Sequence, residues 1–156
     1  MNIWLSDECL SQMRSEATKW APLETGGILL GYVSGEHDVV VNTVIDSGPK
    51  AKHYRHRYEH DSEYERAEAS RLYMRSGAPD FYLGDWHTHP GGQARMSWLD
   101  RKTLATMARK KETISGPVTL ILGEPHWEPC AWRCLRLNIF GMPIVRELKL
   151  CKPNEF

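Results

Sequence analysis

The sequence predicts a mixed α/β (α+β) fold in which three helices flank one curved mixed sheet. Segments with apolar residues at helical spacing alternate along the chain with short runs rich in Val, Ile and Leu. Their order is helix, two strands, helix, strand, helix and three strands, which is typical of helices packed around one sheet. The length of 156 residues favours one domain, which we expect to span residues 1–156.

The first third of the chain supplies one helix and two strands. Ser6 can cap a helix that runs to about Trp20, with acidic residues in its first turn. Residues 26–33 and 38–46 are apolar runs separated by a short turn, so they predict a β-hairpin. Residues 47–60 contain Gly and Pro and show no period, so we interpret them as a loop.

The remainder of the chain supplies two helices and four strands. A segment from about residue 61 to residue 75 is rich in Glu, Ala and Arg and predicts a helix. Residues 81–88 predict a strand, and a helix from Ser97 to about Lys111 follows a glycine-containing loop. Three further strands are predicted at residues 117–123, 131–139 and 143–150.

Composition excludes several classes of function. Twenty basic and twenty acidic residues give a formal net charge of zero, which excludes nucleic-acid binding by bulk positive charge and disfavours a polybasic membrane association. No window approaches the roughly 18 apolar residues of a membrane span, and the first residues do not resemble a signal peptide. Four cysteines without a CxxC pair indicate reduced thiols in a cytoplasmic protein.

The most informative residues are two histidines and one aspartate. His87 and His89 alternate along the predicted strand, so both imidazoles project to the same side. Asp100 lies one turn inside the next helix and shares a face with Leu104 and Met107, which should contact the sheet. A carboxylate on an inward face requires a charged or metal partner, because burying it alone is very costly.

These three residue types are zinc ligands, and three protein ligands leave a fourth tetrahedral position for water. The pattern therefore predicts a catalytic zinc site formed by His87, His89 and Asp100. A pair of packed histidines would explain His-x-His alone, and an ordinary helix cap would explain Ser97 with Asp100. Neither reading explains why all of these residues occur together.

The segment His87-Thr88-His89-Pro90, followed after six residues by Ser97-Trp98-Leu99-Asp100, resembles the JAMM signature of the JAB/MPN metallopeptidases. The family also has a glutamate before a glycine-led strand, and Glu24 in Glu24-Thr25-Gly26-Gly27 matches it. The resemblance implies a JAB domain over nearly the whole chain. It also implies Zn²⁺ as the cofactor, with one catalytic water.

The same resemblance implies roles for two further residues. Glu24, which is not a ligand, would accept a proton from the water and deliver it to the leaving amine. The Ser97 hydroxyl would donate to the developing oxyanion. From the sequence alone, Ser97 can act as the helix cap, as this donor, or as both.

A narrower resemblance concerns the residues around Pro49 and the segment Leu83-Gly84-Asp85-Trp86. Both are similar to short bacterial JAB proteins of CBASS anti-phage operons. That resemblance implies a deubiquitinase-like activity that removes a conjugated protein from the C-terminus of a nucleotidyltransferase. Two alternatives remain open: a peptidase that processes a ubiquitin-like sulfur-carrier protein, and a non-catalytic MPN-like binding scaffold. The expected partner is a protein substrate, with no nucleic acid and no membrane.

Overall fold

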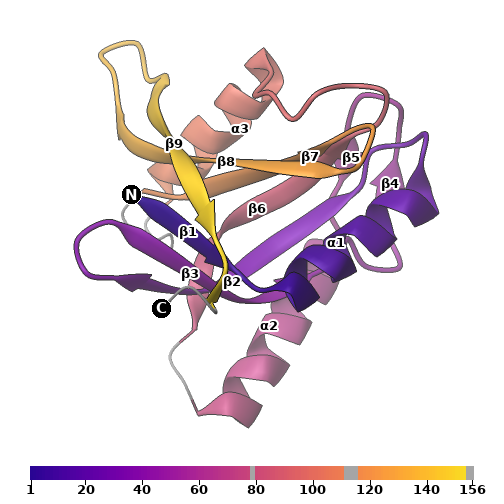
Figure 1. Cartoon of the computed structure of the whole chain (residues 1–156), viewed down its shortest axis with the longest axis horizontal. Helices are drawn as coiled ribbons and strands as arrows, with labels where there is room; N and C mark the ends of the chain where they lie inside the picture. The colour runs from indigo at the N-terminus through magenta and orange to yellow at the C-terminus, as the bar shows by residue number, and fades with distance from the viewer. Residues whose placement is uncertain (78–79, 111–115, 154–156) are drawn as a thin grey trace.

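Seven strands close into a barrel in a computed structural model of the chain, which describes residues 1–77, 80–110 and 116–153 (Figure 1). The barrel strands are β1 (Asn2–Leu5), β2 (Gly26–Ser34), β3 (Asp38–Ile45), β6 (Phe81–His89), β7 (Val118–Gly123), β8 (Glu128–Leu137) and β9 (Pro143–Cys151). Their order around the barrel is β1-β3-β2-β6-β7-β8-β9. The pairs β1–β3, β1–β9 and β6–β7 are parallel and the others antiparallel, so the predicted mixed, curved sheet is confirmed.

Three helices accompany the barrel, as predicted. They are α1 (Asp7–Trp20), α2 (Ser62–Ser76) and α3 (Trp98–Arg109). Each has a side-chain cap at its N-terminus, supplied by Ser6, Asp61 and Ser97, that accepts a backbone N–H of the first turn. The predicted end of the last helix, Lys111, lies outside the described residues.

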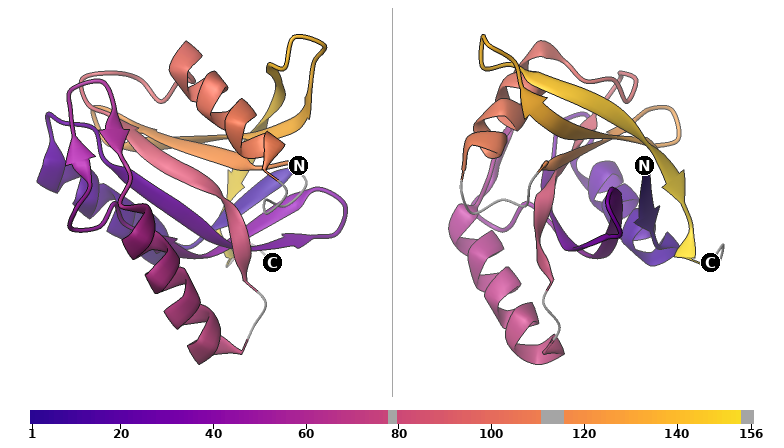
Figure 2. Two further views of the ribbon diagram at one scale, coloured as in Figure 1. Left: turned by 180° about the vertical axis from the view of Figure 1, so that it is seen from behind. Right: turned by 90° about the vertical axis from the view of Figure 1, so that its left-hand side faces the viewer.

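The helices lie on opposite faces of the sheet (Figure 2). On one face, Cys9 and Met13 of α1 join the main apolar cluster with Leu29 and Trp86. The opposite face carries α2 and α3. There, α2 packs on the outward side chains of β2 and β3, while α3 packs on β8 and β9. The site-bearing strand β6 therefore passes between α2 and α3.

Two parts of the fold were not predicted. The strand β1 precedes the first helix, where no strand was expected, and it completes the barrel. Within the predicted loop at residues 47–60, β4 (Lys52–His53) and β5 (Tyr58–Glu59) form a separate two-stranded sheet. Both elements are too short to show a hydrophobic period, and partners elsewhere in the chain stabilise them.

Two expectations from composition can be compared with the structure. All four cysteines are free thiols, and Cys9, Cys134 and Cys151 are buried. None of the helices in the described ranges has the length and apolar character needed to cross a bilayer.

Candidate metal centre and catalytic residues

The alternation of β6 sorts its side chains between the two faces of the sheet. Trp86 and Thr88 are completely buried, and the Trp86 indole donates to the carbonyl oxygen of Ile45 at 3.0 Å. His87 and His89 point to the opposite face, as the period of two predicts. They therefore enter the space between α2 and α3, where only 11% and 16% of their side-chain surfaces remain exposed.

The N-terminus of α3 brings Asp100 to this histidine pair. His87 Nε2 lies 3.1 Å from His89 Nε2 and 3.0 Å from Asp100 Oδ1, and His89 Nε2 lies 3.4 Å from Asp100 Oδ2. Ligand atoms at about 2.0–2.1 Å from a tetrahedral Zn²⁺ are separated from each other by roughly 3.3 Å. The spacing of the three side chains therefore fits a tetrahedral ion.

This cluster is distinctive within residues 1–77, 80–110 and 116–153. Among those residues it is the one group of three or more His, Cys, Asp or Glu side chains whose ligand atoms all lie within 4.8 Å of one another. The histidines of the 53–60 segment do not form a comparable group. His87 and Asp100 of this cluster also line a cavity.

The electrostatics of the cluster favour a charged carboxylate. Burial disfavours the ionised form of Asp100, but hydrogen bonds and charge from His87 and His89 hold the pKa of this carboxyl well below its usual range. Burial likewise disfavours protonated His89, yet the hydrogen bond and charge of Asp100 raise the pKa of this imidazole. The anionic aspartate is the form that ligates a metal.

The orientation of Asp100 has two structural causes. Its backbone N–H donates to Ser97 Oγ at 3.1 Å, while its Oδ2 accepts from the Ser97 N–H at 2.6 Å, which completes a capping box. One and two turns further along α3, Leu104 and Met107 are buried against β8 and β9. The predicted inward face is confirmed, and it directs Asp100 toward β6.

The structure also clarifies how Ser97 can act. A hydroxyl has one hydrogen to donate and two lone pairs to accept. The capping contact uses a lone pair of Ser97 Oγ and leaves the hydroxyl hydrogen available for another acceptor. Capping and donation are therefore compatible in one residue.

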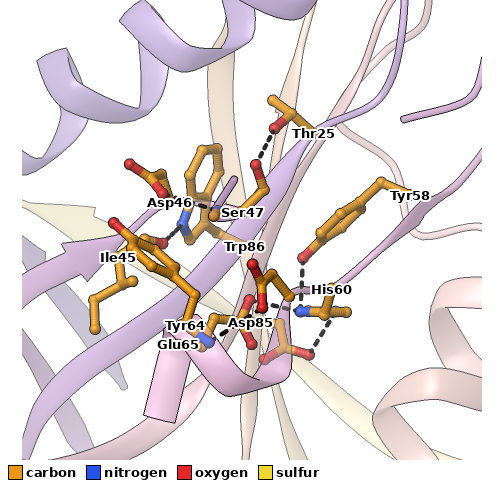
Figure 3. A network of polar contacts seen from close by, with 12 residues as sticks. Thr25, Ile45, Asp46, Ser47, Tyr58, His60, Tyr64, Glu65, Asp85 and Trp86 are labelled. Carbon is orange, nitrogen blue, oxygen red and sulfur yellow. Dashed lines mark hydrogen bonds and ion pairs between the residues drawn. The ribbon is translucent and has the colours of Figure 1, made fainter. Parts of the chain in front are cut away.

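The segment that carries Glu24 is joined directly to the strand of the histidines. The Thr25 N–H donates to Thr88 Oγ1 at 3.0 Å, and the Thr88 N–H donates to the Thr25 carbonyl at 2.9 Å. The Thr25 hydroxyl also contacts Ser47 Oγ at 3.4 Å (Figure 3). Thr88 stands between the two histidines, so this pairing sets the position of Glu24 relative to them.

The two glycines after Thr25 are required by close backbone packing. A Cβ atom at Gly26 would lie 2.2 Å from the Trp86 carbonyl oxygen, and one at Gly27 would lie 1.9 Å from the Ile45 carbonyl oxygen. Both distances are far below contact distance. The Gly-Gly pair therefore permits β2 to lie close to its neighbours directly after Glu24.

Glu24, His87 and Asp100 line one cavity of about 160 Å³. Leu99 of α3 and Arg57 contribute to its wall. Burial raises the pKa of the Glu24 carboxyl, and Asp100 adds to this shift, whereas His87 and His89 oppose it. A glutamate with a raised pKa next to a metal-ligand cluster has the properties of a general acid–base group.

The sequence patterns gave no sign of a further polar cluster, of which His60 and Asp85 line the same cavity. His60 lies 2.8 Å from Glu65 Oε1, 3.3 Å from the Tyr58 hydroxyl and 3.9 Å from Asp85 Oδ2 (Figure 3). Asp85 precedes His87 by two residues, so strand alternation could have placed it on the same face. No local pattern indicates that His60 or Glu65 lies beside it.

Comparisons with known proteins agree with this fold. A solved structure, that of protein DSY2949 from Desulfitobacterium hafniense, superimposes with a TM-score of 0.67 at 22% identity, covering 96% of this chain and 92% of that one. A family model described as prokaryotic homologs of the JAB domain matches residues 6–136. The chain is thus a JAB-domain protein.

It belongs to the Prok-JAB family, and its relatives bear enzyme names. A protein of Sinorhizobium fredii named "Probable metalloprotease y4qB" is 40% identical over 134 residues, covering 83% of this chain and 82% of that protein. A "CD-NTase/cGAS isopeptidase" of Enterobacter hormaechei is 29% identical over 130 residues, covering 78% and 67%. One of the same name from Vibrio cholerae is 31% identical over 78 residues, covering 50% and 49%. These relatives support a peptidase or isopeptidase activity.

Proposed function

We propose that the chain is a zinc-dependent isopeptidase that cleaves after the C-terminus of a conjugated protein. The observation that carries this proposal is the convergence of His87, His89 and Asp100 at tetrahedral spacing beside a cavity that Glu24, His87 and Asp100 line. A binding scaffold would not need the ionised Asp100 carboxylate beside two histidines. Nor would it need the Glu24 carboxyl, with its raised pKa, at the same cavity. The names of the relatives support the same class of reaction.

In this proposal His87, His89 and Asp100 hold one Zn²⁺. Bound Zn²⁺ would lower the pKa of a coordinated water to about 7 and polarise the scissile carbonyl. Glu24 takes a proton from the attacking water and returns it to the leaving amine nitrogen as the carbon–nitrogen bond breaks. The Ser97 hydroxyl donates its hydrogen to the carbonyl oxygen as negative charge develops there.

For the substrate, we propose the C-terminus of a nucleotidyltransferase joined to another protein, in anti-phage defence of the CBASS type. The relatives named CD-NTase/cGAS isopeptidase support this choice. A formal net charge of zero is compatible with a protein substrate rather than nucleic acid. We expect the protein to act in the cytoplasm, as one domain spanning residues 1–156.

The test compares two substrates with the zinc-loaded protein. One carries a nucleotidyltransferase C-terminus linked to a lysine side chain, and the other is a ubiquitin-like protein with a linear C-terminal extension. Mass spectrometry identifies the bond that is cleaved. Faster cleavage of the lysine-linked conjugate supports the proposal, and exclusive cleavage of the linear extension replaces it with sulfur-carrier processing. Cleavage of neither substrate, with His87→Ala equal to the wild type, overturns an enzymatic role.

A further inference from the structure

A pair of hydrogen bonds holds the backbone of Glu24 from one side. The Glu24 N–H donates to the carbonyl oxygen of Tyr54 at 2.8 Å. The carbonyl oxygen of Glu24 lies 2.9 Å from His53 Nδ1. A carbonyl oxygen only accepts, so this ring nitrogen must carry the hydrogen. Both contacts come from consecutive residues at the end of β4.

The His53 ring is itself held in place by aromatic packing. Its centroid lies 3.5 Å from that of Trp20, the last residue of α1, at an interplanar angle of 14°. Tyr58 of β5 lies nearly parallel at 6.5 Å. The stack fixes the direction of Nδ1, so the hydrogen bond to Glu24 has a rigid donor.

The other ring nitrogen indicates what the histidine is for. His53 Nε2 is buried and has no hydrogen-bond partner in the part of the chain that the structure describes. Leaving a buried polar atom unpaired is costly, and a phenyl ring would stack without that cost. Only the Nδ1 contact with Glu24 distinguishes histidine from a purely apolar ring at this position.

We propose that His53 is a positioning residue that sets the Glu24 carboxyl against His87, His89 and Asp100. The inference rests on the proposed function, because it assigns a role to Glu24 as the base. The peptide group between Glu24 and Thr25 is held by Thr88, which accepts its N–H, and by His53, which donates to its carbonyl oxygen. Tyr54 accepts the N–H of the preceding peptide group. Glu24 is thus fixed on both sides. Loss of one of these hydrogen bonds lets the Glu24 carboxyl shift, and a misplacement of about 1 Å can reduce turnover about 100-fold.

Two variants separate the hydrogen bond from the ring stack. His53→Phe keeps the ring on Trp20 and removes the donor, whereas His53→Asn places an amide donor near the Nδ1 position and removes the ring. We expect kcat to fall about 10- to 100-fold in His53→Phe, with KM and zinc content unchanged. We expect His53→Asn to retain more of kcat than His53→Phe. The opposite ranking would assign the role to stacking and overturn the inference.

The matched control is His56→Phe. His56 is an exposed histidine between β4 and β5, and it makes no hydrogen bond among the described residues. We expect this variant to keep the wild-type kcat. If kcat fell as much in this variant as in His53→Phe, replacing any histidine of this segment by phenylalanine would be harmful. That result would overturn the specific role of His53.

A double-mutant comparison tests whether His53 acts through Glu24. In a Glu24→Gln background the base is already lost, so adding His53→Phe should leave the residual rate unchanged. If His53→Phe instead lowers the rate of the Glu24→Gln variant by the same factor as it lowers that of the wild type, His53 does not act through Glu24 and the inference fails. Zinc content, measured for all variants, should remain equal.

Nuclear magnetic resonance decides the geometry without any substrate. Nitrogen-15 spectra of the His53 ring should show hydrogen on Nδ1, and exchange of the Glu24 amide should accelerate about tenfold or more in His53→Phe. A His53 ring with its hydrogen on Nε2, or an unchanged exchange rate of the Glu24 amide, would overturn the proposed hydrogen bond between His53 and Glu24. If the wild type cleaves no conjugate while these signals appear as expected, the proposed function fails, but the hydrogen bond from His53 to Glu24 is still supported.

Discussion

Ser97 and Asp100 hold each other reciprocally: the Ser97 N–H donates to Asp100 Oδ2 at 2.6 Å, and the Asp100 N–H donates to Ser97 Oγ at 3.1 Å. The same aspartate presents its carboxylate to His87 and His89. The start of α3 and the geometry of the candidate metal centre therefore depend on one pair of contacts. A change at Ser97 should affect both the stability of the helix and the chemistry.

Ser97→Ala should lower stability and turnover together. Loss of the cap should reduce the free energy of unfolding by about 1 kcal/mol. Loss of an oxyanion donor should reduce kcat about 100- to 1,000-fold. Denaturant titration and steady-state kinetics on the same preparation measure both effects.

Ser6→Ala provides the control for this variant. Ser6 caps α1 through the Cys9 N–H at 3.1 Å, so it should lose a similar amount of stability while leaving kcat unchanged. Equal loss of kcat in the two variants would show that general destabilisation, rather than the Ser97 hydroxyl, limits turnover.

Glu24→Gln should separate metal binding from hydrolysis. The amide keeps the shape of the side chain but cannot accept a proton, so kcat should fall about 100- to 10,000-fold. Metal analysis should show wild-type zinc content, because Glu24 is not among the three clustered ligand atoms. Glu36→Gln, at a side chain that is 92% exposed, is the matched control and should remain fully active. A Glu24→Gln variant with normal turnover would remove this residue from the mechanism.

Removal of the metal should abolish hydrolysis and lower stability. A ligand that binds only the folded state stabilises it by about 4 kcal/mol when its free concentration is about 1,000 times Kd. Thermal unfolding with a chelator and with added zinc should therefore differ clearly, and zinc should restore turnover. His89→Ala should lose this zinc response, whereas His126→Ala, at an exposed histidine, should keep it. If the protein were only a binding scaffold, the chelator would leave its function unchanged.

The pair formed by half-buried His60 and buried Glu65 should make stability depend on pH. Burial opposes charge on His60, but its hydrogen bond to Glu65 and the charges of Asp85 and Glu65 raise its pKa overall. Burial also raises the pKa of Glu65. The Tyr58 hydroxyl is the remaining close neighbour, and Lys110 opposes the shift of His60 from further away.

Both shifts mean that the folded state holds these protons more tightly than the unfolded chain does. For His60 this stabilisation is complete below the unfolded pKa of histidine, about 6.5, and is lost as the pH rises through the folded value. For Glu65 the same loss begins lower, above the unfolded pKa of glutamate, about 4.3. For protein stripped of metal, Glu65→Gln should cost about 1.5–3 kcal/mol near pH 6 and flatten the decline at higher pH. Urea unfolding from pH 5.5 to 9 measures this, and an equally steep decline in the variant would contradict it.

The three helices, the caps Ser6 and Ser97, and the clustering of His87, His89 and Asp100 could be predicted because their signals are local. His87 and His89 are two residues apart on one strand, and Ser97 and Asp100 share one helical turn. The position of Glu24 came only from a family resemblance, because the Thr25–Thr88 pairing that sets it joins residues 63 apart in sequence. His53 and His60 escaped prediction for the same reason: short strands and aromatic stacking place them, and neither leaves a periodic pattern.

The strand β1 has a consequence beyond its four residues. Ile3 and Leu5 are buried, and β1 pairs with both β3 and β9, so it joins these two strands in the barrel. Detaching it would expose unpaired backbone along both neighbouring strands, and such edges recruit strands from other molecules. We therefore expect β1, which leaves no periodic signal in the sequence, to protect the protein against aggregation, although none of its residues lines the cavity beside His87 and Asp100.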